Sequence, residues 1–434
     1  MTKEEKSWIL YDVGNSAFVL IVVTTIMPIF FKEIASKGIP DAVSTANWGF
    51  ANSLASLILA VLAPILGAIA DFQDLKKKFF IFFLCLGIAF TVLLTAAGPG
   101  AWLSCLIIFI ISRVGWAGAN LFYDSFIVDV TEKKRMDIIS TRGYAYGYIG
   151  AAVPFLLVIF IMLFWEKAEN AAAIAPLPAK IAFLIAAAWW SVFSIPMLRN
   201  VKHKHFAPKT QNPVKDGFLK LLDTFKEIRK YKQVFLFLLA YFFYIDGVDT
   251  IISMATAYGM DIGLKPAMLI LAILMIQVVA FPFALLFGSL ANKYSAKPMI
   301  LTGIGVYMFI TLLAFFLPSF SNLTVRTVLF WVIAFLVATS MGGIQALSRS
   351  YFGKLVPAER SAEFFGFYNI FGKFAAISGP FIMGVITRLT GHSRFGVLSI
   401  LILFISGAVI LKSLPRQHGP AARGTYEGQA KNNF

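Results

Sequence analysis

Two carboxylates stand three residues apart inside a long apolar run, 241-YFFYIDGVDTI-251. If this run is a helix, Asp246 and Asp249 share one of its faces. In a medium of low dielectric constant, two neighbouring carboxylates do not both ionise easily, and their titrations are coupled. The spacing therefore predicts a group that exchanges a proton near neutral pH. The alternative is a structural pairing with a neighbouring Arg or Tyr.

Other polar side chains also lie inside apolar runs, where a charge is costly and faces a bundle interior or a wet cavity. Asp12 and Asn15 repeat the pattern of Asp246 and Asp249 at an offset of 234 residues. Arg113 and Lys373 are fixed cations that suit an anionic group such as a carboxylate or phosphate. The candidates for solute or proton contact are Asp12, Asn15, Arg113, Asn120, Asp246, Asp249, Gln277, Gln345 and Lys373. For the two glutamines a structural role is favoured.

The composition is that of a membrane protein. Of the 434 residues, 59% are hydrophobic and 14% are charged, against about a quarter charged in soluble domains. The two cysteines, Cys85 and Cys105, lie in apolar segments and indicate neither a disulfide framework nor a metal site. No nucleophile–base pair, metal-ligand spacing or nucleotide loop appears, so we expect neither an enzyme nor a cofactor.

Apolar stretches long enough to cross a bilayer, about 20 residues each, occur twelve times. We expect helices, because lipid leaves no partner for an open backbone. The predicted spans are 8–31, 46–70, 79–98, 101–130, 139–165, 179–198, 233–258, 266–291, 298–318, 325–353, 362–387 and 394–414. The corresponding domains are a six-helix bundle over 1–198, a basic cytoplasmic linker over 199–232, a second six-helix bundle over 233–414, and a cytoplasmic tail over 415–434.

Basic residues gather on one side of these spans. With both termini in the cytoplasm, the inner segments hold 26 of the 38 Lys and Arg and the outer loops hold eight. This bias predicts the orientation. It also accounts for most of the net charge of +16, so anionic lipid rather than nucleic acid is the expected partner. For the linker we favour a surface segment with an amphipathic helix near 218–230 at the membrane, and a regulatory or partner-binding role is the alternative.

The two halves of the chain repeat each other. The loops 67-GAIADFQDLKKK-78 and 288-GSLANKYSAKPM-299 align at an offset of 221, which pairs Gly67 with Gly288 and sets Asn292 opposite Asp71. Further along, Asp124 aligns with Arg349 at an offset of 225. Such repeats are typical of transporters built from two related bundles. The sequence predicts an all-α integral membrane protein of two pseudo-symmetric six-helix bundles.

The repeats also suggest a gate on the cytosolic side. Gly67 permits close helix packing, and Asp71 is expected to accept hydrogen bonds from the first amides of the helix over 362–387, where the helix dipole favours an anion. Asp124 and Arg349 are expected to form a salt bridge, with Arg142 as a rival partner for Asp124; a static structural pair is the alternative. The gate candidates are Gly67, Asp71, Asp124, Arg142, Gly288 and Arg349.

Twelve spans, a basic central loop and the G-x-x-x-D loop resemble the major facilitator superfamily. The stretches 8-WILYDVGNSAF-18, 123-YDSFIVDVTEKKR-135, 242-FFYIDGVDT-250 and 347-LSRSYFGKLVPAERSAEFFGFYNIFGK-373 resemble its vacuole-effluxer-like branch, which includes fungal vacuolar amino-acid effluxers and bacterial relatives. Asn292 departs from the acid of the loop motif, and 113-RVGWAG-118 matches only part of the proton-antiporter signature. The resemblance implies the major facilitator fold and transport, and supports antiport less firmly.

These observations predict a secondary active transporter that moves a small polar solute by alternating access, with amino acids favoured and proton coupling as an option. We expect a monomeric multi-pass protein, in the inner membrane if the source is bacterial. One alternative is an exporter or flippase of an amphipathic molecule such as a lipid or drug. A more distant alternative is a membrane receptor or scaffold that transports nothing.

Overall fold

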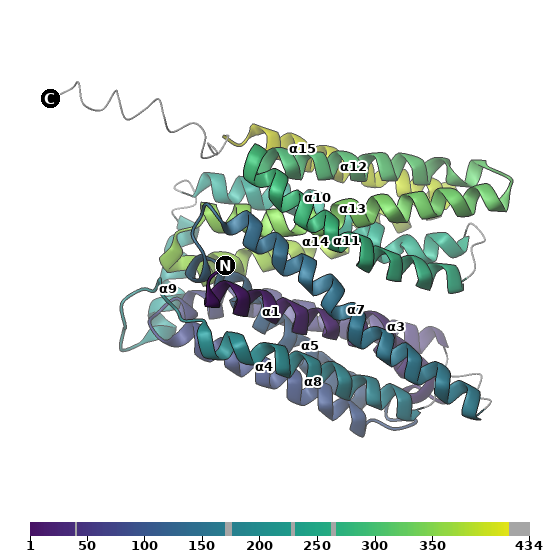
Figure 1. The fold of residues 1–434 in the computed structure, drawn as a ribbon, viewed down its shortest axis with the longest axis horizontal. Coiled ribbons are helices and arrows are strands. Elements are labelled where there is room, and N and C mark those ends of the chain that lie inside the picture. Colours follow the sequence, from purple (N-terminus) through teal and green to yellow (C-terminus); the bar gives the residue numbers. More distant parts are fainter. Residues whose placement is uncertain (40, 170–175, 227–230, 262–265, 416–434) are drawn as a thin grey trace. The chain divides into compact units, whose positions relative to one another are not determined.

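The computed structural model describes residues 1–39, 41–169, 176–226, 231–261 and 266–415, almost all of them helical. Eleven helices in this described part are long and apolar enough to cross a membrane. A further apolar stretch, Ser378–Thr387, lies within the helix that corresponds to the predicted span 362–387. The chain divides into two compact units (Figure 1).

Unit 1 contains Met1–Val130, Gly143–Ile228 and the short segment Val356–Lys373. Its helices are α1 (Lys3–Ala17), η1 (Phe18–Ile26), α2 (Met27–Phe30), η2 (Phe31–Ala35), α3 (Asp41–Ala70), α4 (Leu75–Leu93), η3 (Leu94–Ala96), α5 (Trp102–Ser125), α6 (Ile127–Val130), most of α7 (Met136–Glu169), α8 (Pro176–Asn200) and α9 (Pro213–Lys226), with η5 (Ala358–Arg360) and the start of α14 (Ser361–Thr390).

Unit 2 contains Thr131–Arg142, Arg229–Leu355 and Phe374–Phe434. Its helices are α10 (Lys232–Asp261), α11 (Pro266–Tyr294), α12 (Ala296–Phe316), η4 (Leu317–Ser319), α13 (Leu323–Leu355), the remainder of α14 and α15 (Ser393–Ser413), together with the first turns of α7. Each unit therefore incorporates a short segment from the other half of the sequence.

The first span is continuous from Lys3 to Ala35, but two stretches of it are π-helical. Within η1, the Thr24 and Thr25 hydroxyls donate to carbonyls five residues earlier, at Val19 (2.9 Å) and Leu20 (2.6 Å). Pro28 follows and lacks the N–H that an α-helix needs at its position. The hydrophobic pattern predicts the span without revealing this change of helix type.

Small residues let the helices approach closely. In unit 1 a Cβ on Gly87 of α4 would meet the Trp190 ring of α8, and Gly115 of α5 packs against Gly87 itself. In unit 2, Gly247 of α10 lies against the Phe404 ring of α15. Such contacts supply packing that the hydrophobic effect cannot provide in lipid.

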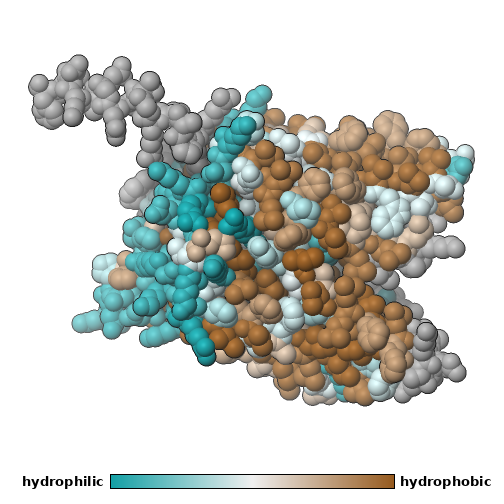
Figure 2. Space-filling view, in the orientation of Figure 1, coloured by the Kyte–Doolittle hydropathy of each residue, from teal (hydrophilic) through white to brown (hydrophobic). Residues whose placement is uncertain are grey.

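The sides of the helices are apolar and exposed, as lipid-facing surfaces are. Phe160 and Phe164 of α7 are each 67% exposed, and Leu389 of α14 is 80% exposed. Figure 2 shows hydrophobic residues along the helices and hydrophilic residues gathered where α9 of unit 1 lies in Figure 1. This distribution fits helices that cross a bilayer with their basic loops in water.

Candidate functional site

A polar cluster lies inside unit 1 on α1. The Asn15 amide donates to Asp12 Oδ1 at 3.1 Å, and its Oδ1 accepts from Trp116 Nε1 of α5 at 3.3 Å. Asp12 and Asn15 are 7% and 5% exposed. A Cβ on Gly147 of α7 would meet the Ser16 side chain and the Asp12 carbonyl, so a glycine there lets α7 approach this part of α1. The cluster holds a carboxylate and an amide in fixed orientation.

Arg113 lies midway along α5, about 17 Å from the first residue of that helix at 1.5 Å per residue. Its guanidinium donates to the Asn52 side chain of α3, and within the described part of the chain no carboxylate pairs with it. It is half-buried. A cation in the middle of a membrane helix with only an amide as partner has capacity left for an anionic ligand.

The neutral candidates occupy half-buried positions. Asn120 lies two turns beyond Arg113 on α5, and Gln345 lies on α13. Gln277 of α11 is also half-buried, and its Oε1 has no hydrogen-bond partner in the part of the chain described. Lys373 lies on α14, but its side chain falls outside the described part of the structure.

Asp246 joins two helices of unit 2. The side chain is fully buried, and Oδ1 accepts from the Gly379 amide of α14 at 2.8 Å. Oδ2 accepts from the Ser378 hydroxyl, and Thr250 adds a longer bond of 3.4 Å to Oδ1. All three donors stabilise the ionised form of the Asp246 carboxylate. Asp249, one turn on, is half-buried. The two aspartates therefore occupy different environments.

The loop between α3 and α4 is fixed to the start of α14. Asp71 is fully buried, and its two oxygens accept from the backbone amides of Ala362 and Glu363, both at 2.9 Å. These amides belong to the first turn of α14, where a helix leaves N–H groups without internal partners. Gly67 lies against the Ala362 carbonyl and the Glu363 backbone. We call this set of contacts the Asp71 latch.

Burial raises the pKa of Asp71 to about 7, although the two amides and the nearby Lys76 and Lys220 act in the opposite direction. The carboxyl would otherwise titrate near 3.9. The latch therefore contains a group that titrates close to neutral pH.

A second ionic centre, which the sequence did not predict, supports the latch. Lys76, at the start of α4, is fully buried and donates to Asp129 Oδ2 at 3.0 Å and to the Ser361 hydroxyl at 2.8 Å. The other oxygen of Asp129 accepts from the backbone amides of Lys204 and His205 at 2.9 and 2.8 Å. Lys76 lies in the first turn of α4 and Asp129 lies in α6, so the pair joins two helices of unit 1.

The linker histidines differ in environment. His205 also places its ring nitrogen 3.2 Å from Asp129, and this contact raises the pKa of His205. Burial lowers the pKa of His203 to about 4. The carboxylate thus favours a positive His205, whereas His203 is neutral at physiological pH.

The linker continues along the latch. Ala207 forms a short parallel bridge with Phe72: its amide donates to the Asp71 carbonyl at 2.8 Å, and its carbonyl accepts from the Gln73 amide at 3.1 Å. Farther on, α9 packs on α3, where a Cβ on Gly217 would meet Ile69. These contacts hold the linker on the α3–α4 loop and on the end of α3.

α9 also reaches the residues that precede and begin α14. The Thr224 hydroxyl is bonded to Glu363 Oε1, and Arg360 donates to both Thr224 and Glu363, the latter at 2.8 Å. Lys220 lies over the Phe72 ring at 5.5 Å, and burial lowers its pKa. The linker helix is therefore part of the surroundings of the latch.

The second copy of the loop motif is built differently. Gly288 of α11 lies against the Thr141 side chain of α7, but Asn292 is exposed and makes no hydrogen bond in the described part of the chain. A carboxylate is supplied instead by Asp137, in the first turn of α7, which accepts from the Ser350 hydroxyl at 2.7 Å and pairs with Lys354.

The remaining gate candidates lie near the ends of their helices. Arg349 of α13 is 2% exposed and donates to the Ser140 hydroxyl (2.9 Å) and carbonyl (3.1 Å) of α7. Asp124 and Arg142 are half-buried. The predicted pairing of Asp124 with Arg349 or Arg142 would join different units and stays a prediction.

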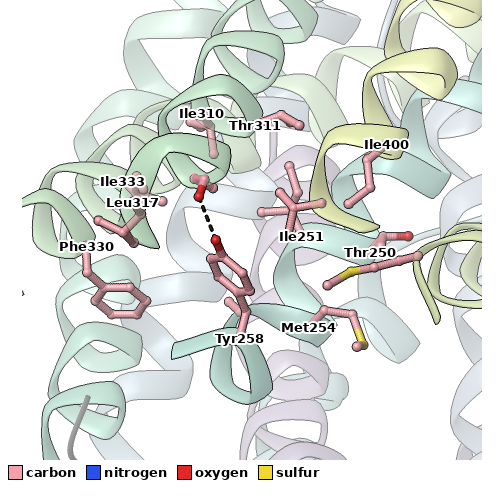
Figure 3. Close-up of a pocket in the computed structure, with 14 residues that line it drawn as sticks. Thr250, Ile251, Met254, Tyr258, Ile310, Thr311, Leu317, Phe330, Ile333 and Ile400 are labelled. Carbon is pink, nitrogen blue, oxygen red and sulfur yellow. Dashed lines mark hydrogen bonds between the residues drawn. The ribbon is translucent and has the colours of Figure 1, made fainter. Parts of the chain in front are cut away.

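An apolar pocket lies within unit 2 (Figure 3). Its few hydroxyls are occupied, because Tyr258 donates to the Ala314 carbonyl at 2.6 Å, Thr311 to the Tyr307 carbonyl and Thr250 to Asp246. The lining residues are Thr250, Ile251, Met254, Ala255, Tyr258, Ile310, Thr311, Ala314, Leu317, Phe330, Ile333, Met383, Val397 and Ile400. No group of three or more His, Cys, Asp and Glu suited to a metal ion occurs among the described residues.

Comparison with known proteins agrees with this architecture. A family model described as "Vacuole effluxer Atg22 like" matches residues 42–423. The MFS-type transporter YxiO of Bacillus subtilis (strain 168) is 46% identical over 417 residues, which cover 96% of each chain. Autophagy-related protein 22 of Saccharomyces cerevisiae (strain ATCC 204508 / S288c) is 22% identical, covering 95% of this chain and 92% of its own.

Among solved structures, the proton:xylose symporter XylE, a major facilitator superfamily protein, matches with a TM-score of 0.69 and 14% identity over 96% of each chain. This similarity shows the fold, and the expectation of a twelve-helix major facilitator architecture is confirmed. The family expected from the loop motifs is confirmed as well. The chain belongs to the Atg22-like vacuole effluxer family and is a multi-pass membrane transporter of the major facilitator type.

Proposed function

We propose that this transporter moves a small polar solute that carries a carboxylate, with an amino acid as the first choice. The observation that carries the proposal is the environment of Arg113. A half-buried guanidinium midway along α5 is held by an amide, Asn52, and by no carboxylate in the described part of the chain. Guanidinium and carboxylate match in geometry and charge. The Asp12–Asn15 cluster supplies groups for an ammonium.

Transport by alternating access is the mechanism that fits a secondary active transporter of this fold. In this proposal the Asp71 latch is the cytosolic gate, because it closes the α3–α4 loop onto the start of α14. Breaking and remaking two charge-assisted hydrogen bonds is within the range of free energies that a solute or a proton supplies. Both termini are placed in the cytoplasm, as the bias of basic residues indicates.

Proton coupling is assigned to Asp246. Its carboxylate holds Ser378 and Gly379 of α14, so a proton on that group would weaken the attachment of α10 to α14. A neutral carboxyl is a poorer acceptor than a carboxylate. Protonation would therefore change how two helices of unit 2 are joined, which is the requirement for a proton to drive movement.

The decisive experiment is reconstitution into liposomes with a panel of labelled amino acids, with and without a pH gradient. We expect Arg113→Gln to lower uptake at least tenfold and Arg113→Lys to retain part of it, since the charge remains but the bidentate geometry is lost. Arg326→Gln, at the start of α13, is the matched control and should leave uptake unchanged. Uptake that survives Arg113→Gln would contradict the carboxylate contact, and gradient-driven uptake that survives Asp246→Asn would contradict the proton role.

A second candidate is export of an amphipathic molecule. The observation in its favour is the pocket of Figure 3, whose lining is apolar and whose hydroxyls are internally bonded. A long-chain amine added to the same liposomes distinguishes the two: its transport, with no amino acid transported, would favour this candidate. Substitution of Met254 by Trp should then block movement of the amine.

A further inference from the structure

The linker helix α9 has an apolar surface that nothing in the described structure covers. Val214, Phe218 and Leu222, at intervals of four residues, are 67%, 47% and 39% exposed. Leu219 beside them is 47% exposed. This exposed set is what we call the outer stripe of α9. Solvated helices rarely present such a row unless it contacts a partner or a membrane.

The opposite side of α9 is already used. Leu221 is 6% exposed, Thr224 is fully buried, and Gly217 lies against Ile69 near the end of α3. The outer stripe is therefore not needed to hold α9 on unit 1, and its apolar residues must be explained by something else.

The place where α9 packs indicates the partner. Ile69 is seven residues, close to two full turns, beyond Leu62, so both side chains lie on the same side of α3. Leu62 is 36% exposed and Val61 59%, as lipid-facing residues are, whereas Ile69 is covered to 6% exposure. α9 thus sits where the lipid-facing surface of α3 ends, which is the level of the lipid headgroups.

The charged residues of the linker also fit a position at the lipid headgroups. Lys215, next to the outer stripe, is exposed, and so are Lys202 and Lys209 earlier in the linker. Of the acids of the helix, Asp216 is bonded to Thr210, and Asp223 follows Leu219 by four residues and so lies at the edge of the outer stripe, away from Phe218. Lysines beside an apolar stripe are typical of helices that lie on an anionic leaflet.

We propose that α9 is an interfacial helix: its outer stripe inserts into the cytosolic leaflet, and Lys215 binds the headgroups of anionic phospholipids. The same helix holds Glu363 and Arg360 through Thr224, next to the amides that bind Asp71. Anionic lipid therefore stabilises the Asp71 latch. This inference does not depend on which solute is transported.

Spin labels test the location of the helix. The full chain carries Cys85→Ser, because Cys85 is exposed, and receives one label at Phe218→Cys or at Asp223→Cys. Both positions are exposed, so neither substitution disturbs the core. The variants are placed in vesicles of phosphatidylcholine, with and without phosphatidylglycerol. We expect the label at position 218 to meet dissolved oxygen more often than a water-soluble nickel complex, and the label at 223 to show the reverse.

Equal access of nickel to both labels in both vesicle types would overturn the proposal and would leave the outer stripe to a protein partner. The charge is tested separately with Lys215→Gln, against Lys134→Gln in another cytosolic loop as the matched control. Removing a lysine near the surface weakens attachment to anionic lipid roughly fivefold. Phosphatidylglycerol should strengthen the preference of the label at position 218 for oxygen over nickel, and we expect Lys215→Gln alone to reduce this strengthening. Equal reductions in Lys215→Gln and Lys134→Gln would contradict a specific contact.

Discussion

The two copies of the loop motif share glycine and lysine but differ in how they use them. In the first copy, Gly67 lies against backbone atoms, Asp71 binds two helix amides and Lys76 pairs with Asp129. In the second, Gly288 lies against a threonine side chain, Asn292 is exposed, and Lys297 donates to the Lys412 and Leu414 carbonyls. The repeat preserves close packing in both copies, and only the first adds a buried carboxylate.

The difference indicates that the first copy is the stronger attachment. Its lysine pairs with a buried acid, and the hydrogen bonds described for the lysine of the second copy go to carbonyls. The linker adds hydrogen bonds at Asp71 and Asp129 of the first copy. The following variants test this asymmetry.

The largest effect is expected from Lys76→Met. It leaves Asp129 as a buried charge without its ammonium partner, at a cost of about 3–5 kcal/mol in the free energy of unfolding. Lys297→Met removes hydrogen bonds to carbonyls and should cost about 1–3 kcal/mol. Thermal unfolding of the purified proteins in detergent measures both. Equal losses for the two lysines would contradict the asymmetry.

Asp71→Asn should come next. The Asn side chain places an NH2 group, which cannot accept a hydrogen bond, where one carboxylate oxygen accepts from the amides of Ala362 and Glu363, at a cost of about 1.5–3 kcal/mol for closing the latch. Hydrogen exchange at these two amides should accelerate accordingly, by roughly 10–100-fold. Asn292→Ala, at the matching position of the second copy, is the control and should leave exchange at the start of α14 unchanged.

Substitution of Gly67 and Gly288 compares the helix packing of the two copies. A Cβ at position 67 would meet the Ala362 carbonyl, which is backbone, so Gly67→Ala should cost about 1–3 kcal/mol through displacement of α14. A Cβ at position 288 would meet the Thr141 hydroxyl, and a side chain turns away more easily. Gly288→Ala should therefore lower the melting temperature less than Gly67→Ala. The reverse order would mean that the second contact is the more rigid one.

The smallest expected effect is that of pH. The closed latch holds the pKa of Asp71 at about 7, above the value of about 3.9 for an exposed aspartate, so closing takes up a proton between these values. Latch stability is therefore gained on acidification and lost as pH rises through 7. From pH 8 to pH 6 the ratio of closed to open latch should rise about tenfold. Labelling of Cys introduced at Gln73 reports this change, and the dependence should vanish in Asp71→Asn.

Much of the fold was accessible from the sequence because lipid imposes simple requirements. Runs of apolar residues predicted helices such as α5 and α15, and the spacing of Gly67 and Asp71 pointed to the start of α14. The role of Asp129 was not predicted, because its partners at Lys204 and His205 come from a linker with no periodic pattern. The π-helical turns after Phe18 were missed for a related reason: hydrophobicity does not distinguish one helix type from another.

The hydrogen bonds of Asp246 to α14 also could not be predicted from the sequence. They depend on where two helices distant along the chain cross, which apolar runs do not specify. The close spacing of Asp246 and Asp249 drew attention to the region. It did not indicate that one carboxylate would be fully buried and the other only half-buried.

The segment Val356–Lys373 belongs to unit 1, although most of the chain is synthesised before it. A ribosome must therefore deliver more than three hundred and fifty residues before Asp71 meets its amides. Until then the Asp71 carboxylate lacks the two amides that hold it, whereas Lys76 already has Asp129 within the same bundle. A chain that stops before Glu363 therefore cannot close the latch.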